Sequence, residues 1–525
     1  MPFKRNANER AKWAAKRVLT IDRPAVGLPQ FDTHGARLYG EALPRGTSIA
    51  RGQQDRDPAN RWMTPHEVLR HRYAPGQLIL GKLGDVPIGH LDDRPIVTIA
   101  GARAGKSTTI LEPNLYLYPG SMLVLDPKGE LAAETAMLRA ATGHRVFVLD
   151  PFGQSGLAGG RFNVIAELDP SSWSVVDDVT SITNALIVEE GGGNSRHWTD
   201  SAKELLKGLI LFALTMPESE RNLVTVRQLL TLTHPALQDA VEASARDAKR
   251  QAKLSGDPSA PEHLRHREQF IQNRTAVEIL LRAMAEHGKR FDGILASVAR
   301  RFLNTPPNER GSVFSTASAQ TDFLDSLPLR VMSKASDFPL AGFRSTQPMT
   351  VYLCLPASKM ETHYRWLRLF VQQSCVTLEK FGRYPRDRPP ILFMMEEFAT
   401  LGHMEIMERA AAYFPGFGVK LWAVLQDSTQ LRRYYSASWE TFLGNAGVLQ
   451  CFANNDLTTQ SYLTNRLAEL IHPFEMEEAF RREDFGQLIK FAGQPPIAAV
   501  RLSHEDVARI RQAAIRQPPR LSRAL

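Results

Sequence analysis

The chain has 525 residues, of which 43% are hydrophobic and 23% are charged, a composition typical of a globular protein with a large core and more than one domain. Its 64 basic and 56 acidic residues give a net charge of +8, which suits a polyanion or an acidic membrane surface and is diagnostic of neither. The cysteines Cys354, Cys375 and Cys451 lie inside apolar runs without paired spacing, which argues against a disulfide framework or a zinc site and favours a reducing, cytosolic compartment.

The N-terminal segment differs in composition from the rest of the chain. Residues 1–57 are polar, and the first 23 residues hold seven lysines and arginines against two acids, so we predict a basic, weakly ordered arm. The arm suits contact with an anionic membrane or a partner, and it equally suits a solvated tail. Thr64, Pro65 and Glu67 then form the pattern of a helix capping box, which indicates that order begins near this point.

Short apolar, β-rich runs recur after this point, and helical patterns separate several of them. The runs are Leu78–Leu80, Ile96–Ile99, Met122–Leu125, Val146–Leu149, Thr350–Leu355, Ile391–Met395, Val419–Leu425 and Val448–Phe452. Apolar strands that alternate with helices predict an α/β domain with a mostly parallel central sheet, buried on both faces.

This alternation breaks once, between about residues 170 and 335. Helical periodicity there covers Trp198–Leu214, Thr225–Leu232, Gln269–His287 and Ile294–Leu303. We therefore predict an all-α domain, residues 171–334, inserted into an α/β domain of residues 58–170 and 335–505. Residues 506–525 are predicted to be a basic C-terminal tail, which suits either contact with nucleic acid or a disordered end.

The most specific motif follows the run Ile96–Ile99. It consists of Gly101, Ala102, Arg103, Ala104, Gly105, Lys106, Ser107 and Thr108, a turn of small residues that closes on Gly-Lys-Ser-Thr. In such a loop, backbone N–H groups surround phosphates, Lys106 reaches the β- and γ-phosphate oxygens, and the Ser107 hydroxyl binds Mg²⁺. These eight residues are predicted to bind a nucleoside triphosphate. The match is imperfect, because Ala100 occupies the position of the first glycine.

A second set of polar residues follows two later strands. Glu396 and Glu397 end the run Ile391–Met395, and Gln426 ends the run Val419–Leu425. At the edge of a sheet that carries a phosphate loop, one carboxylate can hold the metal ion and another can orient and deprotonate the attacking water. We assign the metal ion to Glu396 and the base role to Glu397. Gln426 is either a sensor of the γ-phosphate or a buried glutamine that satisfies loop backbone.

Two charged segments have two interpretations each. Asp126 and Lys128 follow the run Met122–Leu125, where they shape the nucleotide cleft or belong to a plain turn set by Pro127 and Gly129. Residues 245–301 hold twelve lysines and arginines against seven acids, which suits sequence-independent contact with a phosphate backbone or solvated helix faces of mixed charge.

Several blocks in a fixed order carry a family resemblance. They include the phosphate loop, Val124-Leu125-Asp126-Pro127-Lys128-Gly129-Glu130, Phe162-Asn163, Ser312-Val313-Phe314-Ser315-Thr316-Ala317, Glu396-Glu397-Phe398-Ala399-Thr400-Leu401-Gly402, Gln426-Asp427 and Phe491-Ala492-Gly493-Gln494-Pro495-Pro496. Over about residues 60 to 502 the chain resembles the type IV coupling proteins, the conjugative DNA-transfer ATPases. The resemblance implies a RecA-like P-loop motor domain that uses ATP and Mg²⁺, an all-helical domain that meets substrate, and a ring, usually of six subunits, around DNA.

The resemblance also implies roles and partners. Lys106 and Ser107 take the nucleotide roles, Glu397 falls on the catalytic glutamate, and Glu396 stands where the family generally has aspartate. Arg409 and Arg103 are candidates for an arginine finger. The implied partners are DNA, relaxase or effector proteins, membrane components of a type IV secretion system and further copies of this chain. Because the family's membrane anchor is not found here, we expect a cytoplasmic protein that is peripheral at the inner membrane through its partners.

The predicted function is therefore an ATP-driven coupling protein that delivers DNA or protein substrate to a secretion channel. Two alternatives stay open. One is a non-motor substrate receptor or assembly platform for effector or relaxase proteins, and the other is a DNA-processing RecA-like translocase.

Overall fold

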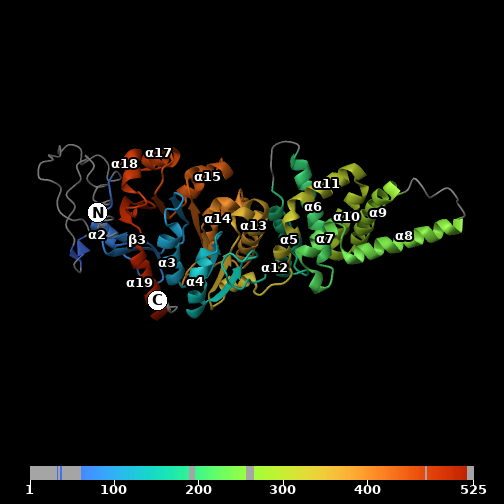
Figure 1. The fold of residues 1–525 in the computed structure, drawn as a ribbon, viewed down its shortest axis with the longest axis horizontal. Coiled ribbons are helices and arrows are strands. Elements are labelled where there is room, and N and C mark those ends of the chain that lie inside the picture. The colour runs from blue at the N-terminus through green and yellow to red at the C-terminus, as the bar shows by residue number, and fades with distance from the viewer. Residues whose placement is uncertain are drawn as a thin grey trace, which may run out of the picture. The chain divides into compact units, whose positions relative to one another are not determined.

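The computed structural model describes residues 32–33, 36–37, 61–188, 195–255, 265–467 and 470–516. The chain divides into two compact units, which Figure 1 shows as a mixed α/β part and a helical part. The first unit comprises residues 1–159, 341–360 and 378–525, and the second comprises residues 160–340 and 361–377. Of the predicted N-terminal arm, only the strands β1 (Asp32–Thr33) and β2 (Ala36–Arg37) lie within the described residues. The predicted boundaries of the α/β domain (residues 58–170 and 335–505) and of the inserted all-α domain (residues 171–334) remain predictions.

An eleven-stranded sheet forms the centre of the first unit. Its order is β4 (Val86–His90), β3 (Leu78–Leu83), β13 (Pro496–Val500), β12 (Gly486–Phe491), β11 (Val448–Phe452), β5 (Ile96–Ala100), β10 (Val419–Leu425), β9 (Ile391–Met395), β6 (Met122–Leu125), β8 (Met349–Leu353) and β7 (Arg145–Leu149). All neighbours from β11 to β7 pair in parallel, whereas the ladders from β11 to β4 are antiparallel. The prediction of a mostly parallel α/β sheet is confirmed.

The parallel strands form because their apolar runs are buried on both faces. Every residue of β5, β6, β9, β10 and β11 is buried. Strands of this kind read as continuous hydrophobic runs, which is why the sequence pattern located them. Since parallel strands present their carboxyl ends at the same edge, the loops after β5, β9 and β10 meet there.

The first unit contains one short helix before the first strand of the large sheet and one helix after its last strand. Near the start, α2 (Pro65–Leu69) begins with the predicted capping box, in which Thr64 and Glu67 exchange hydrogen bonds between side chain and backbone. Near the end, residues 504–516 form α19 (His504–Arg516), which contacts α3 (Glu112–Leu117), the helix behind the phosphate loop.

Helix α19 differs from the predicted basic tail of residues 506–525. Val507 and Ala514 are buried with Tyr116 of α3, and Ile510 packs against the same cluster, so these residues form an apolar stripe at helical spacing. Lys82 of β3 and Asp506 form an ion pair of 2.6 Å whose side chains are nearly buried. Arg509, Arg511 and Arg516 are exposed on the same helix. Residues beyond 516 lie outside the described part of the chain.

The second unit is helical throughout its described residues. It contains α5 (Val175–Leu186), α6 (Ser195–Ala213), α7 (Leu223–Leu230), α8 (Pro235–Ser255), α9 (Arg265–Glu286), α10 (Ile294–Asn304), α11 (Pro307–Gln320) and α12 (Leu327–Met332), together with residues 361–377 of α13 (Ala357–Lys380). Helix α6 contacts α5, α7, α10 and α11, and its Leu205, Leu206, Leu209 and Ile210 are fully buried. The four helical segments predicted for this region lie within or overlap α6, α7, α9 and α10.

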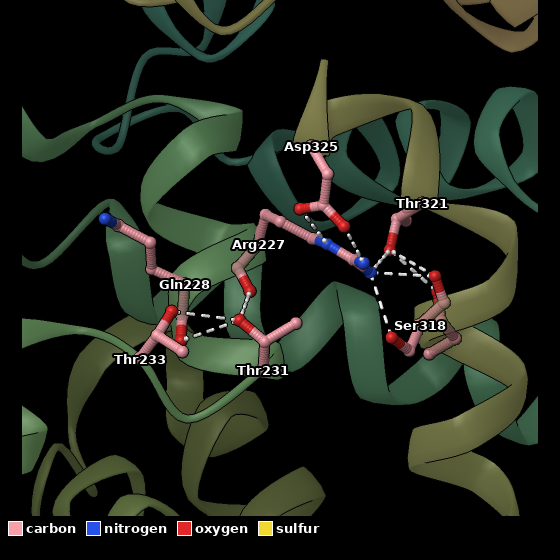
Figure 2. Close-up of polar contacts among 8 residues, drawn as sticks. Arg227, Gln228, Thr231, Thr233, Ser318, Thr321 and Asp325 are labelled. Carbon is pink, nitrogen blue, oxygen red and sulfur yellow. Dashed lines mark hydrogen bonds and ion pairs between the residues drawn. The ribbon is translucent and has the colours of Figure 1, made fainter. Parts of the chain in front are cut away.

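A buried arginine joins α7 to the end of α11 (Figure 2). Arg227 Nη1 donates to the Ser318 carbonyl at 2.7 Å and to Thr321 Oγ1 at 3.0 Å. Its Nε donates to Asp325 Oδ1 at 3.0 Å, and the hydrogen bonds from Arg227 hold the pKa of Asp325 below its ordinary value. Thr231 Oγ1 donates to the Arg227 carbonyl at 2.8 Å, at the C-terminal end of α7. One side chain thereby connects segments that are about ninety residues apart.

Two further findings concern the cysteines and the helices of the described residues. All three cysteines are free thiols and are buried, as their apolar surroundings suggested. Among the described residues, no helix combines the length and the apolar character that a membrane crossing requires.

Candidate nucleotide-binding and catalytic site

The phosphate loop connects β5 to a π-helical turn, η1 (Ser107–Leu111), which continues into α3. Arg103 and Gly105 have φ values of 56° and 82°, so the backbone turns twice through the left-handed region. A Cβ on Gly101 would lie 2.2 Å from the Ala453 carbonyl oxygen, so only glycine fits there. Ala100 is the last residue of β5, where it pairs with Phe452. The position that sterically requires glycine is therefore Gly101, one residue after Ala100.

Lys106 lies inside the loop rather than in solvent. Its side chain is 8% exposed, and Nζ donates to the carbonyls of Ala100 at 3.0 Å and Gly101 at 3.1 Å. Burial lowers the pKa of Lys106, while the charges of Glu397 and Glu396 act in the opposite direction. The ammonium group thus lies within the electrostatic field of both predicted acidic residues.

Glu396 meets the loop directly. Ser107 Oγ donates a hydrogen bond to Glu396 Oε1, and the Glu396 N–H donates to the Leu125 carbonyl at 3.3 Å. Burial raises the pKa of Glu396 to about 7, the Ser107 hydrogen bond opposes this shift, and the neighbouring charges of Asp126 and Glu397 add to it. The two residues predicted to hold the metal ion are therefore in contact.

Glu397 is half-buried beside Glu396, and Gln426 holds it. Gln426 Nε2 donates to both carboxylate oxygens of Glu397, at 3.1 Å and 3.3 Å. Gln430 Oε1 accepts the Gln426 backbone N–H at 2.9 Å, and Asn454 Nδ2 donates to the Gln426 carbonyl at 3.2 Å. Other side chains thus satisfy the backbone here, and the Gln426 side chain orients the carboxylate of Glu397. The sequence did not predict this contact.

Asp126 and Lys128 were predicted either to shape the nucleotide cleft or to belong to a plain turn, and the structure has features of both. Asp126 is fully buried, and its Oδ2 accepts the Ala132 N–H at 2.8 Å in the first turn of α4 (Glu130–Ala141). Gly129 has a φ of 72°, and a Cβ there would lie 2.7 Å from the Ser155 nitrogen, which agrees with a turn that needs glycine. Burial raises the pKa of Asp126 to about 6. The charges of Asp126 and Lys128 nevertheless both influence Glu396, so the turn also shapes the electrostatics of the site.

The sequence analysis missed Arg501, which follows β13. Its Nη1 donates to the Ala104 carbonyl in the phosphate loop, and its Nη2 donates to the Arg482 carbonyl at 3.0 Å. A single arginine after a strand carries no recognisable motif. It reaches the loop because β13, although distant in sequence, belongs to the same sheet.

The two arginine-finger candidates are both exposed. Arg103 lies in the phosphate loop, and Arg409 lies on α14 (Glu405–Tyr413). A finger acts on the site of a neighbouring copy, so its identity stays a prediction.

The loop after β5 and the acids after β9 together define the class of the protein. They form the nucleotide-site arrangement of a RecA-like P-loop NTPase, built on a mostly parallel sheet. The family model described as "Type IV secretory system Conjugative DNA transfer" matches residues 67–470. The chain belongs to this family.

Individual relatives agree with the family assignment. A conjugal transfer protein TraG of Escherichia coli is 26% identical over 471 residues, which are 86% of this chain and 63% of TraG. The type IV secretion system-coupling protein VirD4 of Bartonella quintana is 23% identical, over 81% of this chain and 66% of VirD4. The chain thus spans about two thirds or less of the length of these relatives.

Solved structures agree on the fold. The unbound bacterial conjugative coupling protein TrwB superposes with a TM-score of 0.58 at 14% identity, over 85% of this chain and 93% of TrwB. TrwB in complex with a non-hydrolysable ATP analogue superposes with a TM-score of 0.57 at 13% identity, over 85% of this chain and 94% of TrwB. At 13% to 14% sequence identity, these superpositions show that the fold is shared and nothing further.

Proposed function

We propose that the chain is an ATP-hydrolysing coupling protein, which binds DNA or a protein substrate and drives its transfer to a type IV secretion channel. The observation that carries the proposal is the convergence of Lys106, Ser107, Glu396 and Glu397 at one edge of the sheet. Membership of the conjugative DNA-transfer family and the likeness to TraG and VirD4 support the transfer role.

The residues at the site fit ATP and Mg²⁺. The loop ends at the start of a helical turn, where free N–H groups and the helix dipole favour phosphate. Lys106 adds a positive charge for the β- and γ-phosphates. Ser107 and Glu396 present hydroxyl and carboxylate oxygens, the donor type that Mg²⁺ prefers. When bound, the ion neutralises charge that develops on the phosphates during transfer.

Glu397 is the proposed general base. Its carboxylate is half-buried next to Glu396, and Gln426 fixes its orientation through two hydrogen bonds. A carboxylate fixed in this way can align a water molecule and accept its proton. Glu396 and Glu397 therefore have different proposed roles. Glu396 contacts the loop serine and is proposed to hold the metal ion, whereas Glu397 contacts Gln426 after the neighbouring strand and is proposed to be the base.

The proposed substrates and partners follow from the family and the charge. We propose sequence-independent contact with DNA, together with relaxase or effector proteins and the membrane components of a type IV secretion system. Copies of the chain are proposed to form a ring, usually of six subunits in this family, held at the inner membrane by partner proteins. The net charge of +8 supports contact with a polyanion.

Turnover of ATP by the purified protein, with and without DNA and across a salt series, tests the proposal. We expect DNA to stimulate hydrolysis and the stimulation to fade steeply as salt rises, because phosphate contacts release counterions. Lys106→Ala should abolish both basal and stimulated turnover. Nucleotide binding without turnover under any condition, with capture of relaxase or effector proteins, would instead identify a non-motor receptor.

A further inference from the structure

Arg501 places a buried positive charge against the outer side of the phosphate loop. The side chain is 2% exposed, and its guanidinium spans the carbonyls of Ala104 and Arg482. A Cβ built on Gly105 would lie 3.4 Å from Arg501 Nη1, so the guanidinium also lies next to the residue that precedes Lys106.

Within the described part of the chain, Arg501 has no acidic partner at ion-pair distance. Among the same residues, its Nε makes no hydrogen bond. The rings of Phe452 and Phe485 lie 4.5 Å and 5.1 Å from its central carbon, and they supply cation–π contacts. Burial lowers the pKa of Arg501 to about 9, and it therefore stays charged at neutral pH. Burying an uncompensated charge is costly, so its placement at the loop requires an explanation.

The surrounding backbone is strained at several points. Ala453 and Phe485 have φ values of 51° and 57°, although neither is glycine. The Ala453 carbonyl leaves no room for a Cβ on Gly101 at the start of the loop, and Arg501 donates a hydrogen bond to the Ala104 carbonyl near its end. Strain of this kind is maintained by the surrounding structure and concentrates at functional sites. Residues that follow β11 and β13 thus lie against the two ends of the loop.

The orientation of one peptide unit links this contact to the phosphates. The Ala104–Gly105 peptide is trans, so its C=O and N–H point in opposite directions. With the guanidinium at the carbonyl, the Gly105 N–H points away from Arg501, and the hydrogen bond to the carbonyl polarises that N–H. Backbone N–H groups of such a loop are the groups that surround phosphate.

We propose that Arg501 is a positioning residue for nucleotide phosphate, which presets the Ala104–Gly105 peptide and adds a positive charge behind the loop. The proposal rests on the proposed ATPase function and deepens it. It assigns to the last strand of the sheet a role in nucleotide affinity. Arg501 acts through the loop, so its loss should affect binding of ATP and ADP alike.

The chain offers a matched control in Arg139. This arginine is also 2% exposed, and it donates to the carbonyls of Leu115 at 2.6 Å and Gly120 at 3.1 Å. Like Arg501, it is a buried guanidinium that donates to backbone carbonyls, here at the end of α3 and just after it, and its Nε also donates to Thr350 Oγ1 at 2.8 Å. Burial lowers the pKa of both arginines.

The experiment measures binding of ATP·Mg²⁺, ADP·Mg²⁺ and AMP, steady-state turnover and thermal unfolding for R501M, R501K, R139M and the unmodified chain. We expect R501M to raise Kd and KM for ATP and ADP about tenfold or more, with kcat at saturation changed less than about threefold. R501K should recover part of the affinity because it keeps the charge. R139M should lower the unfolding temperature and leave KM unchanged.

The outcomes separate this proposal from the proposed function. If the unmodified chain binds no nucleotide, the ATPase assignment fails. If it binds nucleotide and R501M binds equally well, or if R139M weakens binding as much as R501M, the role of Arg501 is refuted. If R501M does not fold, the nucleotide affinity of R501K is compared with that of the unmodified chain. A lysine ammonium cannot span the Ala104 and Arg482 carbonyls, so R501K should bind nucleotide more weakly. Unchanged affinity in R501K would then refute the role.

Discussion

The Ser107 hydroxyl donates a hydrogen bond to the Glu396 carboxylate across 289 residues of sequence. Ser107 begins the turn behind the phosphate loop, and Glu396 directly follows β9, so the contact joins the two halves of the proposed metal site. Glutamate reaches the serine directly. The aspartate that is usual at this position in the family is one methylene shorter.

This contact predicts how substitutions at Glu396 affect the metal ion. Glu396→Gln removes the carboxylate, so the Mg²⁺ concentration needed for half-maximal turnover should rise about 10- to 100-fold. Glu396→Asp keeps the charge and should retain turnover, with a smaller shift. A Mg²⁺ titration of ATPase rate measures both. Equal Mg²⁺ dependence in all three proteins would show that Glu396 does not contact the ion.

Substitution of Glu397 should affect chemistry rather than binding. Glu397→Gln removes the proposed base and should lower kcat about 10²- to 10⁴-fold, with ATP affinity retained. Single-turnover kinetics together with equilibrium binding of ATP measure this separation. A Glu397→Gln variant that hydrolyses ATP at the unmodified rate would require another base.

Gln426 should act through Glu397, because its side-chain amide donates to both oxygens of that carboxylate. Gln426→Ala should lower kcat about tenfold, since a mispositioned base loses part of its advantage. In the Glu397→Gln background the same substitution should have little further effect. A double-mutant cycle measures this dependence, and fully additive effects would indicate that Gln426 senses the γ-phosphate independently.

The Arg227 network predicts a pH dependence of stability (Figure 2). The folded-state pKa of Asp325 is below its ordinary value because of Arg227, so its contribution is present at neutral pH and is lost as pH falls through the folded-state pKa. Asp325 is partly exposed, and we expect Asp325→Asn to cost less than about 1 kcal/mol at pH 7. The difference from the unmodified chain should shrink as pH falls below the unfolded-state pKa of about 3.9 and vanish only below the lower folded-state pKa.

Urea unfolding across pH measures this difference. Asp322→Asn, in the same 3₁₀ turn, is the matched control, since Asp322 is exposed and makes no contact with Arg227 among the described residues. Arg227→Ala should cost more, about 2 kcal/mol, because it leaves the buried Thr321 hydroxyl and the Ser318 carbonyl short of a donor. A pH-independent deficit for Asp325→Asn would exclude the ion pair as its cause.

The Lys82–Asp506 pair predicts that α19 is integral to the first unit. Asp506→Asn removes the carboxylate that pairs with the nearly buried Lys82 at 2.6 Å, which should lower the free energy of unfolding by about 3 kcal/mol. Glu505→Gln, one residue away, removes an exposed pair with Arg509 and should cost less than about 1 kcal/mol. Thermal unfolding of the two variants tests the contrast. Equal stability of the two variants would mean that the Lys82–Asp506 pair contributes no more than an exposed pair.

The sequence located the parallel strands and the phosphate loop because each has a local signature. β5, β9 and β10 are continuous apolar runs, and the loop is a contiguous motif. β4, β12 and β13 were missed for a physical reason. Pro87 and Gly89 interrupt β4, Gln487 and Lys490 interrupt the apolar pattern of β12, and Pro496 begins β13. Helix α19 was missed because arginines mask a narrow apolar stripe.

The candidate site was predictable in its residues and less so in its contacts. Glu396 and Glu397 were assigned to one edge because parallel strands share an edge, and the structure brings both near Lys106. The pairing of Gln426 with Glu397 depends on the lateral order of β9 and β10, which no local pattern encodes. Arg501 depends on the position of β13, four strands from β10 in the sheet.

The placement of β5 has a consequence for how the protein is made. Its two neighbours, β10 and β11, begin at Val419 and Val448, so both ladder partners of β5 are translated more than three hundred residues after it. A nascent chain that already carries the phosphate loop still exposes two unpaired strand edges, which are open to aggregation. A chain that ends before Val419 therefore contains the phosphate loop but neither ladder partner of β5, so the strand that leads into the loop has no neighbour in the sheet.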